Sequence, residues 1–326
     1  MDALITFFTS SFSSIYNFGS FLNNACLLMI AGTGASFALK SGHLNLGGEG
    51  QIYLGGYIAA LILTSYWNAP AFVVFATALV ASMAAGILMS LTSALLYEKR
   101  GASVLLTSYI FSLAVIPLID GAITSSNKFT GSNLLATPFI QEKFRLVKLL
   151  SPSPLNISFF IALALCAIAY IFIYKTYAGR KMQVWGKSKQ FALYCGYSSV
   201  ENSVLSLGAT GALHALAGFI AVTGTYYTCH KGFYSGLGWN ALSAALIAQS
   251  NPLLIIPSSI VLSWLYYSAG TVALTQGFGF DVQSLIEGII LFIVAFPFIK
   301  KNFSKKNGIQ KNKKKPNNEK NKVGVK

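Results

Sequence analysis

The sequence predicts an all-α integral membrane protein, a polytopic bundle of about eight to ten transmembrane helices with glycine-rich broken segments. Of the 326 residues, 54% are hydrophobic and only 10% are charged, whereas a soluble domain carries about 25% charged residues. Nine apolar stretches run through the chain, most of them near the length of about 20 residues that crosses a bilayer as a helix. Clusters of glycine and polar residues interrupt some of these stretches, which predicts broken helices.

The predicted spans follow one another closely, so residues 20–299 are interpreted as one membrane domain. The preceding segment, 1–19, is interpreted as an interfacial segment or an extra span, because it lacks the basic start and cleavage site of a signal peptide. The seventh span is short and could instead be a broken or re-entrant segment. The nine spans are residues 20–40, 50–66, 70–97, 102–124, 155–175, 203–224, 237–250, 252–273 and 283–299.

Basic residues set the expected orientation. The net charge is +15, and eleven of the 24 Lys and Arg residues lie from Lys300 onward. We therefore expect 300–326 to be a basic, disordered tail in the cytosol. With this end inside, most of the other cations also fall on the cytosolic side, as the positive-inside rule requires. Topology and anionic lipid explain the charge, so nucleic-acid binding is not expected.

The most unusual stretch is 41–56, SGHLNLGGEGQIYLGG, which surrounds three polar residues with six glycines. Unwound backbone at membrane depth persists only where protein or water satisfies its polar groups. We expect this segment to face the bundle interior or a wet cavity, with Asn45, Glu49 and Gln51 in a translocation pathway or gate. An intramembrane acid is a functional candidate, and the alternative is that Glu49 caps a helix at the cytosolic interface.

Two later segments also combine small and polar residues. In 210–218, TGALHALAG, the small residues predict close helix packing, and His214 is either hydrogen-bonded to a neighbouring helix or a proton relay. In 231–247, Trp239 and Asn240 are further candidates for the pathway or gate. The aromatic residues of that segment would stack on a planar ligand or anchor at the membrane interface.

The long connections predict protein partners rather than catalysis. Residues 125–154 are expected outside, where a soluble donor protein could contact them, and 176–202 suit a short amphipathic helix in the cytosol. The four cysteines are too far apart for a metal cluster, and no phosphate loop, zinc helix or hydrolase elbow is present. We therefore predict that the chain is not an enzyme and needs no cofactor or metal. If ATP drives transport, another subunit must hydrolyse it.

These motifs resemble those of bacterial ABC-transporter permeases of the ribose and branched-chain amino acid type, in particular the branch that imports nucleosides. The resemblance runs in order through 41–60, ATPFI at 136–140, 176–198, 210–218, 236–252 and the closing span around Glu287, covering most of 20–299. It implies that the loop 176–202 docks on the ATPase. The residues at matching positions are Gly179, Arg180, Trp185, Gly186, Ala192 and Gly196.

The resemblance implies a multi-pass subunit of a nucleoside importer in the bacterial cytoplasmic membrane. Its partners would be a cytosolic ABC ATPase, a second permease chain in a heterodimer, and an extracytoplasmic substrate-binding lipoprotein. A permease for simple sugars such as ribose is the alternative within the same class. A proton-coupled secondary transporter, with Glu49, His214 and Glu287 as relay groups, is the alternative from another class.

Overall fold

The computed structural model describes residues 2–65, 69–126 and 135–275, together with 285, 288, 289 and 292. This part of the chain forms helices and no strand, which confirms the predicted helical bundle. The ninth predicted span, Asp281, Glu287 and the basic tail lie outside the described residues, apart from those four positions. The helices long and apolar enough to cross a membrane are α2 (Ile15–Lys40), α4 (Ala71–Arg100), α5 (Val104–Ser126), α6 (Ser158–Lys175), α9 (Ser199–Ile220, continued to Tyr226) and α11 (Pro252–Thr275).

Two apolar helices are shorter, as the glycine-rich composition predicts. Helix α3 (Gly48–Thr64) begins only after a non-helical stretch over 41–47, and α10 (Leu237–Ile247) has 11 residues. At about 1.5 Å per residue, α10 is too short to cross the hydrocarbon core alone. The seventh predicted span is thus too short for a full crossing, as expected for a broken or re-entrant segment.

The amino-terminal segment is helical but separate from the first span. Helix α1 (Asp2–Thr9) and a 3-10 turn (Ser10–Phe12) precede α2, whose first residue is Ile15 rather than the predicted residue 20. The side chain of Ser14 starts α2 because it accepts a hydrogen bond from the Asn17 amide. Helix α1 packs on α11, where the Phe7 ring lies 5.7 Å from that of Trp264.

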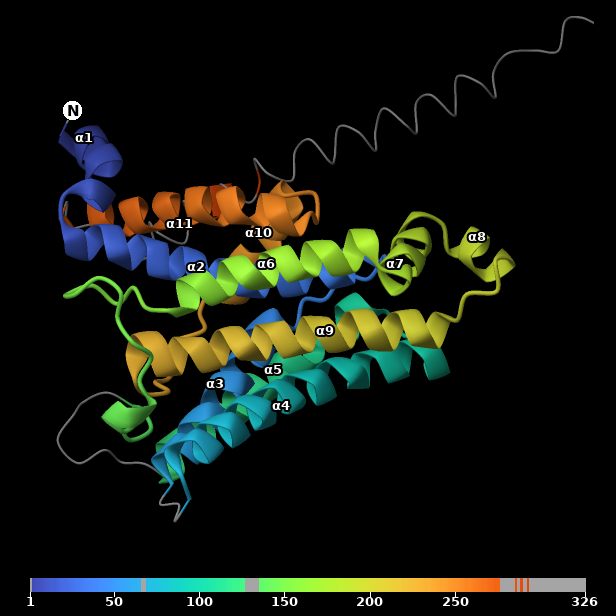
Figure 1. Ribbon diagram of the computed structural model, residues 1–326, viewed down its shortest axis with the longest axis horizontal. Coiled ribbons are helices and arrows are strands. Elements are labelled where there is room, and N and C mark those ends of the chain that lie inside the picture. Colours follow the sequence, from blue (N-terminus) through green and yellow to red (C-terminus); the bar gives the residue numbers. More distant parts are fainter. Residues whose placement is uncertain are drawn as a thin grey trace, which may run out of the picture.

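Helix α9 lies in the middle of the bundle and packs against α2, α3 and α4 (Figure 1). Glycines allow these close approaches. A Cβ on Gly211 would lie 2.7 Å from the Gly86 carbonyl carbon of α4, and one on Gly218 would lie 2.8 Å from the Gly56 amide of α3. This confirms the packing role predicted for 210–218.

Two short helices project beyond one end of the bundle, α7 (Tyr177–Lys187) and α8 (Lys189–Tyr194) (Figure 1). Helix α1 lies at the other end, as does the connection that includes a 3-10 turn at Glu142–Phe144. The helix ends at Lys40, Arg100 and Lys175 are on the side of α7 and α8. The two connections predicted to face opposite sides of the membrane therefore lie at opposite ends of the bundle.

Candidate translocation and coupling sites

The non-helical stretch after α2 is sheltered by α5. Two backbone amides donate to serine hydroxyls of that helix: Leu46 N to Ser108 Oγ at 3.0 Å, and Gly50 N to Ser112 Oγ at 2.8 Å. Asn45 closes the turn itself, since its Oδ1 accepts from the Gly47 amide at 2.8 Å. The prediction that this segment lies inside the bundle is confirmed, because side chains satisfy the backbone groups that the unwound chain leaves free.

Gln51 joins this turn to the central helix. Its Oε1 accepts a hydrogen bond from Asn45 Nδ2 at 3.2 Å and lies 2.7 Å from His214 Nδ1 of α9. All three side chains are more than nine-tenths buried. Because an amide oxygen only accepts, His214 Nδ1 must carry the proton of this hydrogen bond. This arrangement agrees with the reading of His214 as a residue bonded to a neighbouring helix.

Glu49 links the starts of α3 and α10. It is the second residue of α3, is half-buried, and its Oε1 accepts from the Gly236 amide at the start of α10 at 2.9 Å. A Cβ on the preceding Gly48 would lie 3.2 Å from His214 Cε1, midway along α9. The carboxylate therefore caps α10 and lies in the first turn of α3, beside the middle of α9 rather than at the end of the bundle, and both helix dipoles stabilise its charge.

The two remaining pathway candidates lie on different sides of α10. Trp239 is 38% exposed and makes an edge contact with Tyr109 of α5, their ring centroids 6.3 Å apart. Asn240 is 8% exposed and lines a cavity of about 220 Å³ between α2, α10 and α11. The structure thus brings Asn45 and Gln51 together, sets Glu49 at the start of α10, and separates Trp239 from Asn240.

Helix α9 ends in a π-helical turn over Ala221–Tyr226, which sequence reasoning missed. An asparagine network holds it: Asn156 Nδ2 donates to Gly224 O and to Asn23 Oδ1, each at 3.1 Å, and Asn23 Nδ2 donates to Thr225 Oγ1 at 2.9 Å. Asparagine side chains thus form hydrogen bonds with polar groups of the irregular turn. In the sequence, the signal for this network was the pair Asn23 and Asn24 inside an apolar span.

At the opposite end, α7 is fixed to the ends of α6 and α2 through glycines. Thr176 caps α7 by accepting from the Gly179 amide at 3.1 Å. A Cβ on Gly179 would lie 2.6 Å from Ile173 Cα of α6, and one on Gly186 would lie 2.9 Å from the Lys40 carbonyl carbon. Only glycine permits backbones to approach so closely, so α7 is held directly on the turn that leads to Asn45.

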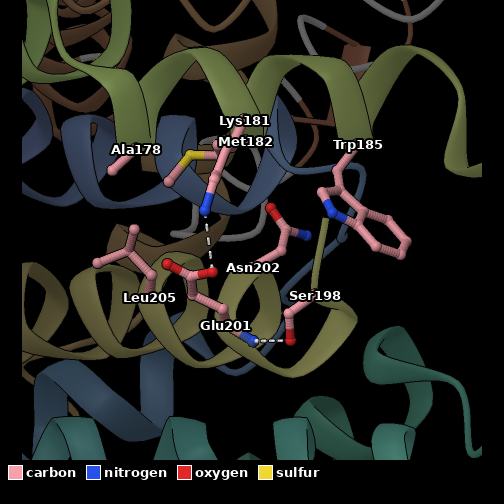
Figure 2. Close-up of a pocket in the computed structure, with 8 residues that line it drawn as sticks. All are labelled: Ala178, Lys181, Met182, Trp185, Ser198, Glu201, Asn202 and Leu205. Atoms are coloured by element: carbon pink, nitrogen blue, oxygen red, sulfur yellow. Dashed lines mark hydrogen bonds and ion pairs between the residues drawn. The ribbon is translucent and has the colours of Figure 1, made fainter. Parts of the chain in front are cut away.

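Trp185 and Met182 bury the inner face of α7 against α9, as Figure 2 shows. An ion pair crosses the same contact, with Lys181 Nζ 3.2 Å from a carboxylate oxygen of Glu201. The space between these side chains is about 10 Å³, room for about one water. This pocket is a packed joint between helices and no ligand site.

The outer face of α7 and α8 is exposed. Arg180 and the neighbouring lysines are at the surface, and Ala192 is fully buried beneath α8. Gly196 has φ +74°, a conformation that favours glycine and ends α8. Three large apolar side chains of α8 are uncovered: Phe191 at 58%, Leu193 at 54% and Tyr194 at 91% exposure. An exposed apolar patch with a basic rim is typical of a protein interaction surface.

Comparison with known proteins adds the family and its relatives. The family described as the permease component of branched-chain amino acid transport systems matches residues 17–295. A probable riboflavin import permease of Treponema pallidum is 30% identical over 90% of this chain and 78% of its own length. A guanosine ABC transporter permease of Bacillus subtilis is 25% identical over 87% of this chain and 82% of its own length. A nucleoside ABC transporter permease of Lactococcus lactis is 24% identical over 90% of this chain and 82% of its own length. No solved structure matches this chain.

Proposed function

Because this chain belongs to the permease component family of branched-chain amino acid transport systems, we propose that it is the membrane-spanning subunit of an ABC importer for nucleosides. The observation that carries the proposal is the family match over 17–295, which covers α2 except its first two residues and every described helix after it. The chain itself would hydrolyse nothing. It would alternate between two conformations that a separate ATPase biases by differential binding.

The outer face of α7 and α8 is the proposed docking surface for that ATPase. We infer from this that the same end of the bundle and the carboxyl terminus would face the cytosol. Phe191, Leu193 and Tyr194 supply the apolar contact, and Arg180 and the lysines supply its rim. Gly186 against the Lys40 carbonyl would transmit ATPase movement to the turn at Asn45. Residues 20–299 would act as one domain, and 300–326 as a cytosolic tail.

The opposite end is the proposed contact for an extracytoplasmic substrate-binding lipoprotein. Lys143, Arg145 and Lys148 lie there on the connection after α5, where Arg145 stacks over Tyr227 with 4.7 Å from its Cζ to the ring centroid. Fixed cations at this end favour an acidic partner surface. A second, non-identical permease chain would complete the membrane part of the transporter, with Asn45, Glu49, Gln51 and Trp239 on or beside the pathway.

Two classes of solute are candidates. Two relatives are named for guanosine and nucleosides, and the relative at 30% identity is named for riboflavin, so riboflavin is the second candidate. Both are neutral compounds in which a planar heteroaromatic ring carries a chain or ring of hydroxyl groups. A simple sugar is the weaker alternative, supported by a glucose permease of Haloferax volcanii at 23% identity.

Uptake of labelled guanosine tests the proposal directly. The chain would be expressed with its partner permease, ATPase and binding protein, and uptake measured with excess unlabelled guanosine, riboflavin or ribose. We expect competition by guanosine and none by ribose. Stronger competition by riboflavin would reassign the solute, and competition by ribose alone would establish the sugar alternative. ATP-independent uptake that a protonophore abolishes would contradict the importer itself.

A further inference from the structure

A cavity of about 220 Å³ lies in this subunit between α2, α10 and α11, which pack against one another (Figure 1). It is far larger than the space one water needs and somewhat smaller than the pockets of about 300 to 1,000 Å³ that hold drug-sized ligands. A small polar molecule would fit it. The lining residues are Asn24, Leu27, Leu28, Tyr226, Phe233, Ser235, Leu237, Asn240, Ser263 and Tyr266.

The lining selects a neutral, polar occupant. It contains two asparagines and two serines but no charged side chain, so an ionic ligand would lose its hydration without a counter-charge. Asn240 is 8% exposed, and within the described chain its Oδ1 has no hydrogen-bond partner. Ser263 Oγ donates to Phe21 O at 2.6 Å, which leaves its oxygen free to accept. The lining therefore carries amide and hydroxyl groups that can form hydrogen bonds with an occupant.

Aromatic rings form the rest of the wall. Phe233 and Tyr266 are each less than 9% exposed, and the rings of Tyr226 and Phe233 lie 5.8 Å apart at 53°. The π-helical turn and the left-handed Tyr227, φ +60°, set Tyr226 at this point of the chain. Such π turns recur at functional sites. Aromatic faces beside amide groups are the combination that holds a planar heterocycle, by stacking and by edge hydrogen bonds.

We propose that this cavity binds a neutral planar heterocycle with sugar-type hydroxyls inside a single permease subunit. The site rests on the proposed function, since it would be occupied by the transported solute. The rings would stack on the heterocycle, the Asn240 amide would bond its edge, and Asn24, Ser235 and Ser263 would bond hydroxyl groups. Simple sugars lack the ring face, so they would bind only through the polar half of the cavity.

Cysteine protection in the assembled transporter tests this site. In a Cys195→Ser background, which removes the one exposed cysteine of the described residues, Asn24→Cys and Ser235→Cys, at the two exposed polar lining positions, would be labelled with a maleimide, with and without guanosine or riboflavin. We expect at least fivefold slower labelling of both thiols with the transported solute and no protection by ribose. Phe72→Cys, at the exposed start of α4 and outside both proposed docking surfaces, is the control whose labelling should not change.

A second variant separates binding from folding. Asn240→Leu keeps the side-chain volume but removes the amide, and should raise the guanosine concentration for half-maximal protection about tenfold, the effect of one lost buried hydrogen bond. Equal labelling with and without both solutes, in a transporter that imports one of them, would overturn this site and leave the proposed function intact. A wild-type complex that imports neither guanosine nor riboflavin would overturn the proposed function, and this site with it.

Discussion

The backbone of Gly186 rests on the carbonyl group of Lys40, so that the exposed helix α7 touches the last residue of the first membrane span. A Cβ at Gly186 would lie 2.9 Å from the Lys40 carbonyl carbon and 3.2 Å from the Gly42 amide. Gly42 has φ +82° and begins the turn that leads to Asn45 and Glu49. In the proposed coupling, a displacement of α7 by a bound ATPase would pass through these backbone contacts to the glycine-rich segment.

Gly186→Ala should uncouple the transporter. The added methyl group overlaps the Lys40 carbonyl, and overpacking of this kind costs about 1–3 kcal/mol, which α7 would relieve by moving away from α2. We expect at least a tenfold loss of uptake and weaker co-purification of the ATPase, with helix content unchanged by circular dichroism. Gly121→Ala, where a methyl group meets nothing within 4 Å, is the matched control. A stable Gly186→Ala protein with wild-type uptake would contradict the coupling role.

Gly211→Ala should destabilise the bundle itself. Its Cβ would lie 2.7 Å from both the Gly86 carbonyl carbon and Ser90 Cβ, where α4 and α9 cross. Neither backbone can yield without separating the two helices, so we expect a loss of about 1–3 kcal/mol in the free energy of unfolding. Gly208→Ala lies one turn earlier on α9, where the nearest atom is Leu91 Cδ2 at 3.8 Å. Thermal denaturation in detergent should give a lower midpoint for Gly211→Ala only.

Glu49 should act as a hydrogen-bond acceptor rather than as a proton carrier. Glu49→Gln keeps an oxygen for the Gly236 amide, now 2.9 Å from Oε1, and loses only the charge–dipole attraction of up to about 2 kcal/mol. Glu49→Leu leaves that amide without its acceptor at a cost of about 1–3 kcal/mol. We expect uptake within about fivefold of wild type for the first variant and a far larger loss for the second. Equal abolition by both would favour a role for the ionised carboxylate in transport.

Local composition was sufficient to predict most of the fold. Apolar length located the spans, and the polar glycine-rich stretch at 41–56 predicted a break that the structure places over 41–47, before α3. The start of α2 was placed five residues late, because Ser14 begins the helix through its side chain while Tyr16 and Asn17 weaken the apolar pattern. Helix packing was predictable at Gly211 and Gly218, since small residues recur there at helical spacing.

The arrangement of the candidate sites depended on contacts between distant segments. Nothing local to Glu49 indicates that its carboxylate caps a helix that begins at Leu237, and nothing local to Gln51 indicates His214 as its neighbour. The π-helical turn at the end of α9 depends on Asn23 and Asn156, which are far from it in sequence. Spacing along one chain predicts which residues are polar, but tertiary packing decides which of them meet.

His214 provides the sharpest test between an ATP-driven importer and a proton-coupled transporter. Its Nδ1 forms a hydrogen bond of 2.7 Å with Gln51 Oε1, which joins α9 to α3. The side-chain amide of an asparagine also carries an N–H donor and can replace the imidazole in this bond. If His214 is structural, His214→Asn should retain uptake within about threefold, with the same dependence on pH between about 5 and 8, where histidine titrates. His214→Leu, which has no donor, should lower thermal stability and uptake together. A pH profile that flattens in His214→Asn, with uptake abolished by a protonophore at constant ATP, would instead assign proton coupling to this residue.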